Sequence, residues 1–278
     1  MAAPLMLSYL PRGSFIHKLT GTTKLCFFML VSISAMVTYD TRLLAVLLAG
    51  TLVLFKCSRL HLRDVKWVLW LAFVFLVLNN LFVYIFSPEY GVDLYESRTV
   101  LFTLVGRYTI TTQQLFYHLN LILKVATVIP LALVFILCTD PSEFAASLSS
   151  VGISYRIGYS VALALRYIPD IQRDYREISQ AQQARGVDIS GKDKFWDRLK
   201  GSVNILMPLI LSSLSRIDTI SNAMELRGFG KNRKRTWYVL RPFKRNDWIA
   251  LGVSIAILAV TLFVAWMDGS RFWNPFLG

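Results

Sequence analysis

Five long apolar runs dominate the sequence, and each is predicted to form a helix that crosses a membrane. A bilayer core requires about 20 apolar residues in helical form, with a range of about 17–25. Charged residues are sparse inside the runs and gather in the segments between them. The expected spans lie at 25–38, 43–55, 65–86, 115–138 and 248–267. This pattern predicts an all-α, polytopic helical membrane protein with about five transmembrane helices.

The first two runs are shorter than a bilayer core requires. They are separated only by Tyr39-Asp40-Thr41-Arg42, so we expect a tight helical hairpin whose helices extend somewhat beyond their apolar runs. A single buried re-entrant pair is the alternative. The fourth run contains Pro130, which predicts a kink, and Lys124, which we interpret as a structural lysine that snorkels or faces the bundle.

Residues 139–246 form a long polar connection between the fourth and fifth runs, with eighteen Lys+Arg and ten Asp+Glu. A helix is expected to start at Thr139-Asp140-Pro141 and to end near Gly152, because Pro suits the first helical position. Two long amphipathic helices follow, the second beginning near 195 or 202, with Pro169 expected to kink the first. Their apolar positions recur every three or four residues, which is typical of close helix–helix packing: Ile157, Val161, Ala164, Ile168, Ile171, Tyr175 and Ile178, then Leu206, Ile210, Leu214, Ile217, Ile220 and Met224.

The two long helices are predicted to end in the same way. The segment 178–186 recurs 42 positions later as 220–228, with Ile, Ser, Ala, Arg and Gly matching in register. Each copy ends in Arg followed by Gly: Arg185-Gly186 and Arg227-Gly228. Gly favours the left-handed turn after a helix, and Arg complements the helix dipole. The duplication indicates a twofold-related task, such as docking two similar partners, although two ordinary helix ends remain the simpler alternative.

Composition supports a membrane protein with a basic face. The chain has 278 residues, is 55% hydrophobic and 17% charged, has a mean hydropathy of +0.50, and carries a formal charge of +13. Soluble domains average roughly 45–50% apolar and about 25% charged, so disorder and an ordinary soluble enzyme are excluded. A nucleic-acid binder would carry similar charge without the long apolar runs. We interpret the basic run 231–235 as a flank that contacts lipid, with RNA binding a weaker alternative.

Basic residues predict the orientation, because they are enriched in cytoplasmic connections. The N-terminal segment and the second and fourth connections are basic, whereas the opposite connections are not. The short second connection is the strongest indicator, with Lys56, Arg59, Arg63 and Lys66. We therefore expect a multi-pass protein of the cell membrane with a cytoplasmic N-terminus and an outer C-terminus. Its domains would be a four-span region at 1–138, a cytoplasmic coupling domain at 139–246, and the last span with an outer tail at 247–278.

No catalytic, metal or cofactor site can be proposed from the residues. The sequence lacks the Gly-x-x-x-x-Gly-Lys-Ser/Thr loop that cradles nucleotide phosphates, so the chain is not expected to hydrolyse ATP. The three histidines are scattered, and the three cysteines lie in or beside apolar runs, where we interpret them as small buried hydrophobes.

Four motifs give the chain a specific resemblance. They are Thr139-Asp140-Pro141, the segment Ala164-Leu165-Arg166-Tyr167-Ile168-Pro169, Gln183-Ala184-Arg185-Gly186, and Ala223-Met224-Glu225-Leu226-Arg227-Gly228. In this order and spacing the chain resembles the transmembrane T component of energy-coupling factor (ECF) transporters, the ABC-type vitamin importers. Nearly the whole chain is covered. At position 226 the chain has Leu where the family usually has Ala. The roles implied for Arg and Gly are unchanged, but the larger side chain would alter how tightly the helix end fits its docking partner.

The resemblance implies a non-catalytic scaffold. Two ABC ATPase subunits would dock on Ala184, Arg185, Gly186, Leu226, Arg227 and Gly228, and the apolar stripes would pack the coupling helices. A small membrane-embedded substrate-binding S component would contact these helices and release a vitamin inside after ATP hydrolysis. Two alternatives remain. An intramembrane enzyme acting on a lipid-linked substrate would need clustered Asp, Glu or His at a span end, and a secondary transporter would need repeats within the membrane region.

Overall fold

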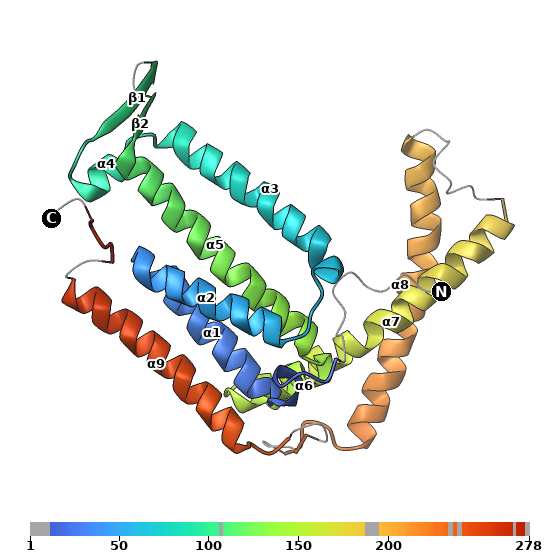
Figure 1. The fold of residues 1–278 in the computed structure, drawn as a ribbon. Coiled ribbons are helices and arrows are strands. Elements are labelled where there is room, and N and C mark those ends of the chain that lie inside the picture. The colour runs from blue at the N-terminus through green and yellow to red at the C-terminus, as the bar shows by residue number, and fades with distance from the viewer. Residues whose placement is uncertain are drawn as a thin grey trace. The chain divides into compact units, whose positions relative to one another are not determined.

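The structure is a computed structural model that describes residues 12–105, 108–186, 195–232, 236–237, 241–268 and 271–275. The chain divides into two compact units, one formed by Met1–Asp140 with Arg241–Gly278 and the other by Pro141–Leu240. Helices dominate both units (Figure 1). The all-α class predicted from the sequence is therefore confirmed.

The first unit contains the predicted membrane helices. Its longer helical elements are α1 (Gly21–Val37), α2 (Thr41–Cys57), α3 (Leu62–Phe86), α5 (Thr112–Cys138) and α9 (Arg245–Met267), and the short helix η1 (Ile16–Lys18) precedes α1. Each includes its predicted apolar run except at residue 38, which caps α1. Both α1 and α2 have 17 residues, so they extend beyond their apolar runs as expected. At about 1.5 Å per residue, each is roughly 26 Å long.

Local side-chain bonds explain where three of these helices begin. The side chains of Thr20 and Thr111 accept hydrogen bonds from backbone N–H groups at the starts of α1 and α5. Asp40 Oδ1 does the same for α2, at 2.8 Å from the backbone nitrogen of Arg42. Such caps satisfy N–H groups that have no partner within the helix. The tight connection predicted between the first two helices is confirmed.

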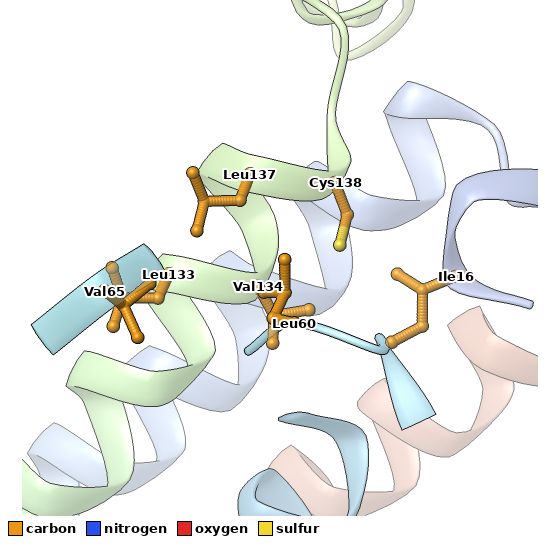
Figure 2. Packing of buried hydrophobic residues seen from close by; sticks show 7 residues of the cluster. All are labelled: Ile16, Leu60, Val65, Leu133, Val134, Leu137 and Cys138. Atoms are coloured by element: carbon orange, nitrogen blue, oxygen red, sulfur yellow. The ribbon is translucent and has the colours of Figure 1, made fainter. Parts of the chain in front are cut away.

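The core of this unit forms around α5. That helix contacts α1, α2 and α3, while α1 also packs along α9. Figure 2 shows one buried cluster, where Leu133, Val134 and Leu137 of α5 meet Val65 of α3 and Ile16 of η1. A second cluster joins α5 to α1 and α2 through Val31, Ala35, Leu44, Leu47 and Leu131. The predicted helical hairpin therefore packs mainly on α5 and α9, and its two helices make few contacts with each other.

Among the described residues, four helical segments are long and apolar enough to cross a membrane: α3, α5, α9 and the segment Gly201–Leu226. The first three coincide with predicted spans, and α1 is a shorter apolar helix. The fourth segment differs from our expectation, because it belongs to the second long amphipathic helix, which was not predicted as a span. It is long and apolar enough to cross although it contains Arg216 and Asp218.

A small substructure between α3 and α5 was not predicted. It consists of helix α4 (Tyr90–Tyr95) and an antiparallel pair, β1 (Val100–Val105) and β2 (Tyr108–Thr111). Side chains at the start of α5 hold it: Gln114 Oε1 accepts from the backbone nitrogen of Gly91 at 2.7 Å, and Gln113 Oε1 accepts from that of Thr99 at 3.1 Å. The β-branched runs on either side of Gly106-Arg107 were an available signal for a hairpin.

The second unit contains the three helices predicted for the long connection. They are α6 (Pro141–Ser150), α7 (Tyr155–Ala184) and α8 (Phe195–Leu226). Gly158 lets α7 approach α6 closely, because a Cβ atom there would lie 3.0 Å from the carbonyl oxygen of Ala145 and 3.2 Å from the Trp237 ring. Arg156 Nη2 donates to the carbonyl oxygen of Gly230 at 2.9 Å. This bond ties the chain beyond α8 back to the start of α7.

Candidate functional site

The first arginine motif forms the end of α7. The helix ends at Ala184, and Arg185 is its C-cap, with its backbone N–H bonded to the carbonyl oxygen of Gln182 at 3.1 Å. Gly186 has a φ of +87°, a left-handed conformation that a residue with a Cβ adopts at a cost. Gly186 therefore stops the helix and leaves Arg185 as the residue that caps it.

The second arginine motif forms the end of α8 in the same manner. Gly228 has a φ of +67°, and its backbone N–H donates to the carbonyl oxygen of Glu225 at 2.8 Å. The backbone N–H of Phe229 donates to the carbonyl oxygen of Met224 at 2.9 Å. These two hydrogen bonds together form a Schellman motif. Both helices thus terminate at a glycine that directly follows an arginine.

Both arginine side chains are exposed, as are Ala184 and Gly186 beside the first and Leu226 and Gly228 beside the second. Leu226, directly before Arg227, is 89% exposed. Neither guanidinium pairs with a carboxylate among the residues that the structure describes. Two rigid helix ends therefore each present a cation to the surroundings.

The two long helices cross at an ion pair that the sequence analysis missed. Arg216 Nη2 of α8 lies 2.5 Å from Asp174 Oδ2 of α7, and Figure 1 shows the crossing. The two residues are 42 positions apart, which is also the spacing of the repeated arginines. Asp174 precedes Arg185 by eleven residues, and Arg216 precedes Arg227 by eleven residues. Each arginine therefore lies about 16 Å along its helix from the crossing.

The apolar stripes predicted to pack the coupling helices lie largely on exposed faces in this chain. Four residues of the first stripe and four of the second are at least 40% exposed: Ile157, Ile168, Ile171, Tyr175, Leu206, Ile210, Leu214 and Ile217. Instead, the buried large apolar residues in the described part of α8, from 201 onward, are Ile205 and Leu209. The contact between α7 and α8 also includes a bond of 3.1 Å from Gln182 Nε2 to the carbonyl oxygen of Asn204. Most of the stripe residues therefore do not pack between α7 and α8 in the described part of the chain.

Several charged and polar groups of the first unit serve its internal structure. Lys124 is 5% exposed; its Nζ donates to the carbonyl oxygen of Met36 at 2.8 Å and lies 3.1 Å from the ring centre of Tyr39. His118 bonds Asn80 and Gln114 through its two ring nitrogens. Lys124 thus faces the bundle, as interpreted from the sequence. Within the described ranges, no group of three or more His, Cys, Asp or Glu is placed to hold a metal ion.

The fold and the exposed helix ends together define a multi-pass helical membrane protein with a separate unit that presents paired cationic tips. Residues 12–238 match the family described as CbiQ, cobalt transport protein. The match covers most of the chain, which therefore belongs to this family of transport proteins.

Curated relatives give the same result over a longer stretch. The energy-coupling factor transporter transmembrane protein EcfT of Streptococcus equi subsp. equi (strain 4047) is 28% identical over 264 residues, covering 92% of this chain and 94% of that protein. EcfT of Staphylococcus aureus (strain 04-02981) is 28% identical over 269 residues, covering 94% and 96%. EcfT of Limosilactobacillus fermentum (strain CECT 5716 / Lc40) is 38% identical over 110 residues, covering 40% of each chain. The resemblance to the ECF transmembrane component is confirmed.

Proposed function

We propose that this chain is the energy-coupling scaffold of an ECF transporter. Two ABC ATPase subunits dock on the helix ends at Arg185 and Arg227, and a membrane-embedded S component binds the vitamin or other micronutrient. The observation that supports this most directly is the pair of exposed Arg-Gly helix ends, one on each of two crossed helices. The chain itself contributes no catalytic group to ATP hydrolysis.

The shape of the crossed pair suits the transmission of force. A guanidinium offers a planar set of donors that fits carboxylates in an acidic groove. Each arginine directly follows a long helix. A force applied to the arginine is therefore transmitted along the helix and is not dissipated by a flexible loop. The equal spacing of both tips from the Asp174–Arg216 pair supports two similar partners, each acting at the same distance from the crossing.

The exposed apolar stripes are proposed to contact the S component and the membrane surface. Their side chains lie on α7 and α8 in the unit that carries the arginine tips. We place α8 along the membrane instead of across it, because the helix carries Arg216, which is paired with Asp174 of α7. Charges are costly at the centre of a bilayer. Movement of the tips would then pass directly to the helices that touch the S component.

The proposed orientation places the N-terminus and the second unit in the cytoplasm, and the C-terminus outside. The basic connections of the sequence support this, because positive residues are enriched on the cytoplasmic side. The ATPases would then meet the arginine tips in the compartment that contains ATP.

Charge reversal at the two tips tests the docking role. In the double variant Arg185→Glu, Arg227→Glu, co-purification of the ATPase subunits with the full chain should be lost, because a carboxylate is repelled by an acidic groove. Arg176→Glu is the matched control, since Arg176 is exposed on the same helix but lies nine residues before its arginine tip. Normal assembly and uptake in the double variant would reject the proposal.

A further inference from the structure

An apolar groove of about 550 Å³ lies in the first unit among α1, α2, α5 and α9. Phe27, Phe28 and Val31 of α1 line it, together with side chains from α2, α5 and α9. It forms because α1 packs on α9 and α5 while α2 packs on α5, which leaves few contacts between α1 and α2. Most of the remaining wall residues are apolar, and the polar ones are Thr23, Lys24, Thr51 and Asn246.

The groove opens to the surroundings along α2 and α9. Val46 and Val53 of α2 are 69% and 60% exposed although they line the groove, and Ile249 of α9 is also exposed. Gly50 lies between the two valines, and a Cβ atom added to it would meet nothing within 4 Å. An elongated apolar molecule could therefore enter from the side without passing through the protein.

The size of the groove selects a hydrocarbon chain over a helix. A helix with its side chains is about 10–12 Å wide, and a length that crosses the bilayer core is about 30 Å. Such a cylinder occupies roughly 2,400 Å³ or more, whereas all the empty space within the groove, its open side included, is about 1540 Å³. A narrow and flexible chain of methylene groups fits this volume.

One end of the groove is basic. Leu19 and Asn246 line that end, and the neighbouring residues Lys18, Lys244 and Arg245 are exposed. The acidic residue beside them, Asp247, is buried, and its carboxylate already accepts bonds from Thr20 N at 2.8 Å, Thr20 Oγ1 at 3.1 Å and Lys244 N at 2.9 Å. The exposed charge at this end is therefore positive, and basic residues at a membrane surface attract anionic lipid headgroups.

We propose that the groove is a specific site for an anionic phospholipid. One acyl chain lies between α2 and α9, and the phosphate sits at Lys18, Lys244 and Arg245. This lipid would fill the gap that α1 and α2 leave between them, so it would be retained when the looser lipids around the protein are washed away. The inference does not depend on the partners proposed above.

Lipid retention can be measured on the full chain by native mass spectrometry. The purified chain is stripped of lipid, mixed with dioleoyl phosphatidylglycerol or dioleoyl phosphatidylcholine, and washed in detergent. We expect one phosphatidylglycerol per chain to remain, with at least tenfold less phosphatidylcholine. Equal retention of both lipids by the unmodified chain would overturn the role of the basic end and with it the proposal.

Filling the groove tests the acyl-chain part of the site. Gly50→Phe should reduce phosphatidylglycerol retention at least tenfold, because the ring occupies the opening. Gly252→Phe is the matched control: Gly252 is an exposed glycine within α9 that also has nothing within 4 Å, and it does not line the groove. If either Phe variant fails to fold, Gly50→Leu and Gly252→Leu give the same comparison. Equal retention by the two variants of a pair would reject the site.

Removing charge tests the headgroup part. The variant Lys18→Gln, Lys244→Gln, Arg245→Gln should retain the two lipids to within about twofold of each other, and an unchanged preference for phosphatidylglycerol would contradict the proposal. A partner helix is the competing occupant. If Gly50→Phe releases a membrane polypeptide from the complex while phosphatidylglycerol retention stays unchanged, the groove belongs to that partner and the lipid proposal falls.

Discussion

Reversing one charge at the crossing of α7 and α8 should uncouple ATP hydrolysis from uptake. In Asp174→Arg, two guanidinium groups would face each other where an ion pair of 2.5 Å now joins the helices. The arginine tips at 185 and 227 are unchanged in this variant, so the ATPases should still bind. The ion pair would no longer stabilise the angle at which α7 and α8 cross.

The structure sets the size of the effect. The side chains of Asp174 and Arg216 are 17% and 33% exposed, so the pair lies between a surface pair and a buried one. Exposed pairs contribute about 0.2–1 kcal/mol, and breaking a buried pair costs about 3–5 kcal/mol. We therefore expect a loss of about 2 kcal/mol in Asp174→Arg. Since 1.4 kcal/mol corresponds to a factor of about ten, the crossed geometry should become more than tenfold less favoured.

The assay is ATP-driven uptake by the complete complex in proteoliposomes, measured beside ATPase co-purification. Asp174→Arg should lower uptake at least tenfold and leave co-purification intact, while the exchanged pair Asp174→Arg, Arg216→Asp should recover uptake to within about threefold. Asp170→Arg is the control, because Asp170 pairs with Arg173 on its own helix at 2.9 Å and makes no ion pair with α8 among the described residues. Normal uptake in Asp174→Arg, or no recovery in the exchanged pair, would refute the reasoning.

Two further predictions concern the first unit. Gly91→Ala should destabilise the purified chain by about 1–3 kcal/mol, because the new Cβ would lie 2.7 Å from the Cα of Gln114; Gly252→Ala, at an open helical site, should be neutral or slightly stabilising. The measurement is the thermal unfolding midpoint in one detergent, and equal midpoints for these variants would contradict the proposed close packing. Lys124→Met should cost about 1–3 kcal/mol, because the bond to the Met36 carbonyl and the contact with the Tyr39 ring are both lost. Ile122→Met on the same helix is the control for that measurement, and a Lys124→Met midpoint no lower than that of the control would show that the lysine does not stabilise the bundle.

Much of this protein could be predicted from local signals. The apolar runs determined α3, α5 and α9 to within a few residues, because an apolar segment of sufficient length needs no distant partner to be helical in a membrane. The ends of α7 and α8 could also be predicted. The glycine after each arginine is a local signal for a helix end, and both Gly186 and Gly228 adopt left-handed conformations. The hairpin of β1 and β2 also had a local signal, in the β-branched runs around 106–107, and it was overlooked.

The faces of the long helices could not be predicted in this way. The segment 203–211 is apolar nearly all round, so periodicity favoured Leu206 and Ile210, whereas the fold buries their neighbours Ile205 and Leu209. One residue corresponds to about 100° around a helix, and only the position of α7 chooses between these faces. The Asp174–Arg216 pair and the groove beside α1 have the same origin. Both depend on how separate helices meet, and side chains far apart in sequence carry no local signal of that meeting.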